Sequence, residues 1–175
     1  MKRLTEQELE RLVEEQSLYL QERVCFPADF SNMDLSNMDI SGRCITEAEF
    51  ENSNLSGVKA QYADMCYVNF TGSNFTGANL SNALLSGADL VNCNLTNANL
   101  VGTDICYANF TGSDLTGADF RNAKLSGTEL VNCNLTNADF TGANLSDADF
   151  TGANLTGAKF TGANLANARI EINKL

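Results

Sequence analysis

The sequence predicts an all-β solenoid: a four-sided β-helix of about seven 20-residue coils that follows an N-terminal helix. Three observations support this fold class. Every fifth residue from Phe30 to Ile170 is apolar, without exception. The residue types in this series segregate with a period of 20. Residues 66–105 and 106–145 match at 25 of 40 positions, so the chain also repeats itself over twice that period.

Residues 1–24 lack the five-residue period and predict a helix that caps the open end of the solenoid. Thr5 and Glu8 have the spacing of a capping box. Leu4 and Leu9 can close a hydrophobic staple around it. An apolar stripe follows, interrupted by Gln16, and consists of Leu9, Leu12, Val13 and Leu20. Terminal coils need such a cover, because they otherwise expose core and strand edges. The alternative is a helix that recruits a partner.

Residues 25–175 form the predicted β-helix, built from a five-residue unit with a large apolar centre. A small residue stands two positions before most centres, and all 13 glycines stand two positions after one. A period of five matches neither the 3.6 of a helix nor the 2.0 of a strand. The chain can satisfy it by turning a corner after each unit, with Gly or Asn at the corner. The large and the small residue then point inward.

Four such units close one coil, and the residue types agree with that closure. The centres from position 30 in steps of 20 read Phe, Phe, Phe, Leu, Phe, Leu, Phe and Ile, whereas the series from position 35 is Leu except for Phe75. We therefore expect Phe50, Phe70 and Phe110 to share one interior column. Stacked coils would pair their backbones at the usual strand spacing of about 4.8 Å.

Units such as ADFTG, ANLTG and ANLSN make the chain resemble the pentapeptide repeat family, in unbroken register over most of its length. The resemblance implies a right-handed quadrilateral β-helix. It leaves function open, since most members have no assigned biochemical role. Some members protect type II topoisomerases from quinolones and are thought to imitate duplex DNA. The plasmid-borne protectors carry loops between coils, and this sequence has none.

The acidic residues follow the repeat. Twelve of the 22 precede an apolar centre, at a position that faces outward. One column collects five of them, a candidate interaction stripe of Asp29, Glu49, Asp89, Glu129 and Asp149. With a net charge of −11, this stripe fits a protein partner or imitation of DNA, and the charge opposes direct binding to nucleic acid. The other interpretation is that acids suit this position and keep the surface soluble.

A second outward column carries hydroxyls, namely Ser36, Ser56, Thr76, Thr96, Thr116, Thr136 and Thr156. Flat threonine ladders are typical of ice-binding β-helices, which gives an ice-type surface binder as a further alternative. Ser and Thr fill this position on most sides of the coil, however, and stacked hydroxyls also stabilise strand ladders.

Enzymatic chemistry finds no support in the sequence. The chain has no histidine, and its glycines are all taken by corners, so neither a general base of that kind nor a phosphate-binding loop is expected. The six cysteines form no CxxC pair, and we interpret them as free thiols. The prediction is a non-enzyme without cofactor or metal. The acidic N-terminus and the absence of a long apolar run favour a cytoplasmic protein without a membrane segment.

The C-terminal coil has no helix of its own and continues the apolar register. Ile170, Ile172 and Leu175 form a candidate dimer edge beside unpaired backbone groups. Exposed strand edges invite pairing, so we expect a homodimer through this coil. A monomer is the alternative, if Glu171 and Lys174 guard the edge.

Overall fold

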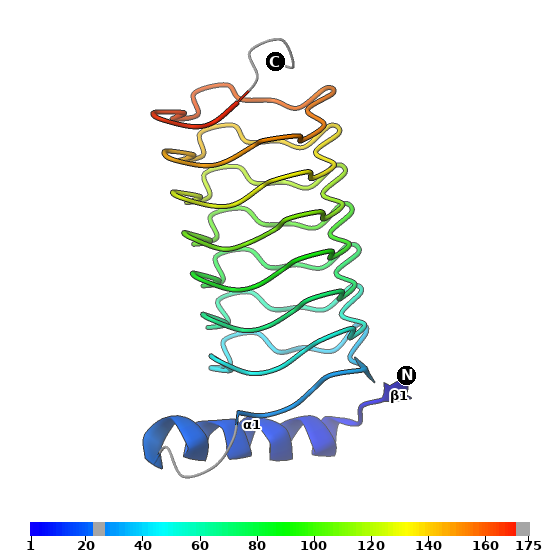
Figure 1. The fold of residues 1–175 in the computed structure, drawn as a ribbon. Helices are drawn as coiled ribbons and strands as arrows, with labels where there is room; N and C mark the ends of the chain where they lie inside the picture. Colours follow the sequence, from blue (N-terminus) through cyan, green and yellow to red (C-terminus); the bar gives the residue numbers. More distant parts are fainter. Residues whose placement is uncertain (23–26, 171–175) are drawn as a thin grey trace.

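The computed structural model describes residues 1–22 and 27–170 and shows a rod of stacked coils with a helix across one end (Figure 1). Strand β1 (Lys2–Arg3) leads into helix α1 (Glu6–Glu22), and strand β2 (Met33–Asp34) lies at the start of the rod. β1 and β2 pair in parallel. Above them the coils pair through isolated bridges, because each side of a coil is only a few residues long.

The coils stack in a parallel register of 20 residues. Every isolated bridge joins residues 20 positions apart, from the pair Asp29 and Glu49 to the pair Asp149 and Arg169. Each apolar centre from Phe30 to Phe150 donates its N–H to a carbonyl 19 residues later, as Phe70 N does to Asp89 O at 2.7 Å. The backbone of one coil therefore satisfies the backbone of the next. The predicted four-sided coil of four pentapeptides is confirmed.

Every corner of the rod is a type II turn. The carbonyl of each centre accepts a hydrogen bond from the N–H three residues later, as between Phe75 and Ala78 at 2.9 Å. The residue two positions after each centre has a positive φ, which a type II turn requires there. We call this the corner position. Gly, Asn and Asp occupy it at all but four of the corners that the structure describes, and the exceptions are Glu47, Tyr62, Tyr67 and Tyr107.

The rod has four faces, each formed in every coil by one centre and the two residues before it. We number them by their centres, in steps of 20 residues: face 1 from Phe30 to Ile170, face 2 from Leu35 to Leu155, face 3 from Ile40 to Phe160 and face 4 from Ile45 to Leu165.

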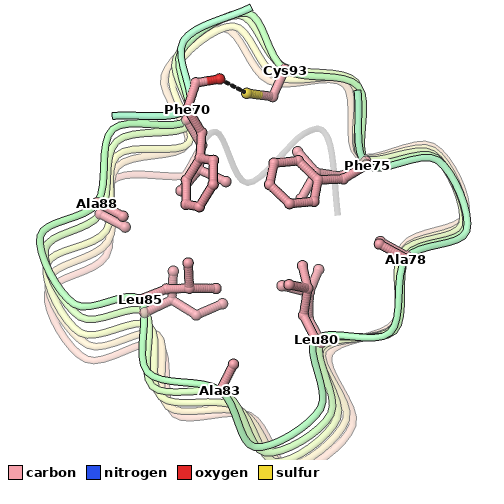
Figure 2. Packing of buried hydrophobic residues seen from close by; sticks show 14 of the residues in the cluster. Phe70, Phe75, Ala78, Leu80, Ala83, Leu85, Ala88 and Cys93 are labelled. Atoms are coloured by element: carbon pink, nitrogen blue, oxygen red, sulfur yellow. Dashed lines mark hydrogen bonds between the residues drawn. The ribbon is translucent and has the colours of Figure 1, made fainter. Parts of the chain in front are cut away.

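The core is a column of side chains from all four faces. Figure 2, a view down the rod, shows Phe70, Phe75, Leu80 and Leu85 meeting at its axis, with alanines filling the space between them. Aromatic rings stack along the faces, with centroids 4.4 Å apart for Phe30 and Phe50, and the Phe70 ring follows at 5.1 Å from Phe50 in a tilted arrangement. Phe110 belongs to the same column as predicted, but Leu90 separates it from Phe70.

Face 2 carries an inner row of hydrogen-bond donors that the repeat pattern did not reveal. Each buried hydroxyl or thiol of this row, from Ser53 to Cys133, donates to the carbonyl of a face-1 centre in the coil below. Cys93 Sγ lies 3.0 Å from Phe70 O (Figure 2), and Ser113 Oγ lies 2.7 Å from Leu90 O. In the described residues, no buried side-chain nitrogen or oxygen lacks a hydrogen-bond partner. Two of the cysteines are therefore structural donors in places that serine also fills.

The N-terminal segment closes the first coil in two ways. Leu4 N donates to Asp34 O at 2.9 Å, so β1 and Leu4 continue the ladder of face 2 below its first centre. The predicted capping box is confirmed: Thr5 N donates to Glu8 Oε2 and Glu8 N donates to Thr5 Oγ1. Leu9 and Leu12 are buried in the core cluster, and Val13 is partly buried against it. Leu20, expected on the same face, lies beyond the side chains that the structure describes.

Gln16 is the residue that attaches the middle of α1 to the rod. Its side chain is fully buried. Its amide oxygen accepts from Ala28 N at 2.6 Å, and its amide nitrogen donates to Thr46 O. The polar interruption of the apolar stripe thus satisfies one N–H and one carbonyl of the first coil. In the regular ladder Thr46 O would accept from residue 27, but Pro27 has no N–H.

Candidate protein-interaction surface

The structure aligns the predicted acidic stripe as one column along face 1. The bridges connect Asp29 to Glu49 and Glu129 to Asp149, and Asp89 lies between these pairs. Two asparagines, Asn69 and Asn109, interrupt the column. Its far end is neutralised in part, since the Arg169 guanidinium lies 3.3 Å from the Asp149 carboxylate. The stripe is therefore straight, but the two asparagines and the arginine reduce its negative charge.

The stripe position has a structural use of its own. A carboxylate or amide oxygen there accepts the backbone N–H two residues later, as Asp89 Oδ1 does from Val91 N at 3.2 Å and Asn69 Oδ1 from Thr71 N at 3.1 Å. These are Asx turns that support the corner. The Thr151 hydroxyl, the backbone of the same turn and the Arg169 charge hold the pKa of Asp149 below its usual range. This geometry supports the interpretation that Asp and Asn suit the position.

The hydroxyl column beside face 2 is also used locally. Thr76 Oγ1 donates to Asn74 Oδ1 at 2.6 Å, and Thr96 Oγ1 donates to Asn94 Oδ1 at 2.7 Å. The same bond recurs at Thr116, Thr136 and Thr156. The donor hydrogens of these threonines therefore stabilise their own corners and are not presented to solvent.

The feature that the sequence analysis missed is a set of exposed large side chains around face 4. Along the described coils, the large apolar and aromatic side chains that are more than a third exposed are Tyr62 (70%), Tyr67 (69%), Leu84 (43%) and Tyr107 (75%). We call these four residues the tyrosine patch. Tyr62 precedes face 4 and Tyr67 follows it in the same coil, Leu84 lies on face 4 one coil later, and Tyr107 follows face 4 in the coil after that.

The three tyrosines occupy strained backbone positions. Each has a φ of 59°, in the left-handed region that bulky residues avoid, at a cost of about 1–3 kcal/mol per residue. Asparagine or glycine at these corners would relieve the strain. The sequence did carry a signal: tyrosine is foreign to the corner position of the repeat, and an average over the repeat hides it.

Two of the rings lie along the corner that joins faces 4 and 1. A β-carbon on Gly87 would stand 2.6 Å from Cε1 of Tyr67, and a β-carbon on Gly127 would stand 2.6 Å from Cε1 of Tyr107. Each ring therefore covers the glycine of the next coil. Asn97 covers Gly117 in the same manner at another corner, with its Oδ1 2.5 Å from the corresponding β-carbon. At these corners the side chain of one coil thus occupies the space that a β-carbon in the next coil would need.

Acidic side chains accompany the tyrosine patch. The bridges place Leu84 directly between Asp64 and Asp104 on face 4. Asp64 also lies between Tyr62 and Tyr67 along the chain. Asp104 accepts from Ser86 Oγ at 2.9 Å and pairs with Lys124 Nζ at 3.1 Å, and both partners of this ion pair are reachable by solvent. The patch therefore combines aromatic rings, one aliphatic side chain and two carboxylates.

Three of the thiols offer little reactivity. Burial raises the pKa of Cys93 and of Cys133 to about 12, and burial with the nearby Asp64 raises that of Cys66 to about 11. The five described cysteines, Cys44, Cys66, Cys93, Cys106 and Cys133, are free. Within residues 1–22 and 27–170, no three histidine, cysteine or acidic side chains come together in a way that could hold a metal ion.

The predicted dimer edge is described only at its first residue. Ile170 is partly exposed and packs against the core cluster, together with Phe160 and Leu165 of the last coil. Ile172 and Leu175 lie outside the described residues. The ladder from a centre N–H to the carbonyl 19 residues later ends with Phe150 and Arg169 in the described part of the rod. No described helix is both long and apolar enough to cross a membrane.

The fold and its surfaces define a class of protein, a repeat solenoid with side chains in fixed outward columns. The family models give the class its name. The model described as pentapeptide repeats (8 copies) matches residues 28–72 and 73–112, and the model of a pentapeptide repeat region matches residues 103–175. The chain belongs to the pentapeptide repeat family. No curated protein matches it.

Solved structures share the fold. A trypsin-treated variant of QnrB1, a plasmid-mediated fluoroquinolone resistance protein, is 20% identical with a TM-score of 0.59, over 84% of this chain and 87% of that one. Full-length QnrB1 is 20% identical with a TM-score of 0.52, over 84% and 90%. HetL, involved in heterocyst differentiation regulation in the cyanobacterium Nostoc, is 23% identical with a TM-score of 0.32, over 95% and 94%. The family and the QnrB1 likeness confirm the right-handed quadrilateral β-helix, and at these identities they show the fold alone.

Proposed function

We propose that this protein is a non-catalytic interaction scaffold that binds a protein partner through the side of the rod formed by face 4 and its two corners. The tyrosine patch carries this proposal. Along the described coils, large exposed apolar and aromatic side chains occur there and hardly elsewhere, and exposed groups of this kind are typical of interaction sites. Tyrosine is among the residues enriched in protein interfaces.

The rigidity of the rod supports the same function. Its coils satisfy one another's backbone groups, so binding would order little of the chain beyond the patch. The strained corners add to this support. Asparagine fills this corner position elsewhere at a lower cost in backbone strain. The three tyrosines therefore lower the stability of the fold while they place aromatic side chains on its surface. The acidic stripe on face 1 adjoins the corner of Tyr67 and Tyr107 and extends the surface.

Site-specific photo-cross-linking tests the proposal. A cross-linking amino acid at Ser86, which adjoins Leu84, is expected to capture a defined protein from extracts of the native cells. The same group at Thr96, at the corner that joins faces 2 and 3, is the matched control. Capture at both positions, or at neither, would show that the patch is not the binding surface.

A DNA-mimicking binder of a type II topoisomerase is the alternative. The straight acidic column favours it, and the interruptions at Asn69 and Asn109 and the ion pair of Arg169 weaken it. Inhibition of gyrase supercoiling by the purified protein, lost when Asp89 and Glu129 are changed to asparagine and glutamine, would establish this function in place of the first.

The homodimer through the C-terminal coil stays a prediction. The partly exposed Phe160, Leu165 and Ile170 favour it, because a second copy could cover them. The cytoplasmic location also stays a prediction.

A further inference from the structure

We infer that the tyrosine patch recognises an arginine-bearing segment of a partner protein, with two cationic side chains set about 10 Å apart. This inference rests on the proposed function and names the chemistry of the partner. It follows from which groups the patch combines and from how the coil repeat spaces them.

The carboxylates determine the charge of the partner. Asp64 and Asp104 lie two coils apart on face 4, which is about 10 Å at the usual strand spacing. The stripe residue Asp89 follows Gly87 on the neighbouring face, beside the corner where the Tyr67 ring lies. The chain as a whole carries a net charge of −11, so its field favours a cationic partner over any other.

The tyrosines favour arginine over lysine, and Leu84 suits the aliphatic stem of either side chain. A guanidinium is planar, stacks on aromatic faces and pairs with a carboxylate through two parallel hydrogen bonds. Tyr62 and Tyr67 bracket Asp64 along one coil, and Tyr107 follows Asp104 two coils later. Leu84, between the two carboxylates, offers an apolar surface for the aliphatic stem of the arriving side chain.

Lys124 provides an internal competitor. Its ammonium lies 3.1 Å from Asp104, and both side chains are reachable by solvent. Exposed pairs of this kind contribute little to stability, so a bidentate guanidinium can displace the lysine. Lys124→Ala is therefore expected to strengthen binding, which a purely structural role of Asp104 would not produce.

The experiment uses displayed libraries of random linear peptides, selected against the full chain. Selected peptides are expected to be enriched in arginine, and replacing each arginine by lysine should weaken binding. The decisive variant moves the tyrosines without changing composition: Tyr67→Asn and Tyr107→Asn are combined with Asn97→Tyr and Asn137→Tyr. The new tyrosines would cover Gly117 and Gly157, as the asparagines now do, so the fold has room for them.

In this swapped variant, measured by fluorescence anisotropy, the selected peptides should bind about tenfold more weakly or worse. Lys124→Ala should bind about threefold more tightly. Circular dichroism checks that both variants are folded. Peptides without arginine enrichment, equal binding by the swapped variant, or no gain from Lys124→Ala would each overturn the inference. A partner captured through Ser86 despite such a result would leave the proposed function in place and only its arginine chemistry refuted.

Discussion

Replacing Gln16 by alanine should detach helix α1 from the first coil. The side chain is buried and satisfies Ala28 N–H and Thr46 C=O. Leaving a buried backbone group without a partner costs about 1–3 kcal/mol. The Ala28 bond is buried and the Thr46 bond only partly so, which gives an expected loss of about 3 kcal/mol in the free energy that holds the cap.

Hydrogen exchange measured by mass spectrometry is the assay, because a solenoid can open at one end while the rest stays folded. Protection in residues 28–46 should fall by about a hundredfold, while the coils around Phe120 keep theirs. Gln16→Leu keeps most of the volume but no hydrogen bond, and should lose nearly as much protection. Gln7→Ala, on the exposed side of α1, is the control. Wild-type protection in Gln16→Leu would refute the role of the amide.

Four further predictions concern the core, the thiols, the acids and the assembly. Phe70→Ala should lower the free energy of unfolding by about 3–5 kcal/mol in denaturant titrations. Phe70→Leu should lower it by less than about 1.5 kcal/mol, since leucine fills the same column at Leu90. Equal losses in the two variants would contradict the assignment of Phe70 to this column. Cys93 and Cys133, whose pKa burial raises to about 12, should resist alkylation near neutral pH until the chain is unfolded, which mass spectrometry detects as unlabelled thiols. Acids such as Asp149 have a pKa that is lower in the folded than in the unfolded chain, so they stabilise the fold fully above the unfolded pKa of about 3.9, and this stabilisation is lost as pH falls through the folded pKa. The thermal unfolding temperature should therefore decline only below about pH 4. A decline that begins near neutral pH would require another cause. Light scattering should give about 38 kDa, twice the 18.9 kDa chain, and a monomer mass at all micromolar concentrations would disprove the dimer.

Most of the fold could be predicted because the inward and corner positions obey simple physical rules. In a five-residue period an apolar centre such as Leu85 must point into the core, and the left-handed backbone of the corner favours Gly or Asn. The capping box at Thr5 and Glu8 is equally local, since it depends only on the start of a helix. These features depend on each residue and its neighbours in sequence.

The features that could not be predicted depend on what lies beyond those neighbours. Gln16 interrupts an apolar stripe in the sequence, and only the first coil, against which helix α1 packs, shows which backbone groups its side chain satisfies. The thiol of Cys93 has a partner in the preceding coil, so its role as a donor is hidden in a list of small residues. Tyr67 and Tyr107 depart from the residue types of the repeat, and the consensus of the five-residue unit does not show such single departures.

The covering of one corner by the side chain below it also bears on how such a chain can lengthen in evolution. Where Tyr67, Gly87, Tyr107 and Gly127 alternate, deleting the single coil that carries Gly87 would place Tyr107 directly above Tyr67, with the ring of one aimed at the β-carbon of the next. Inserting two coils keeps the alternation intact. Residues 66–105 and 106–145, which match at 25 of 40 positions, are two coils each, so the length of the repeated unit is a length that this alternation tolerates.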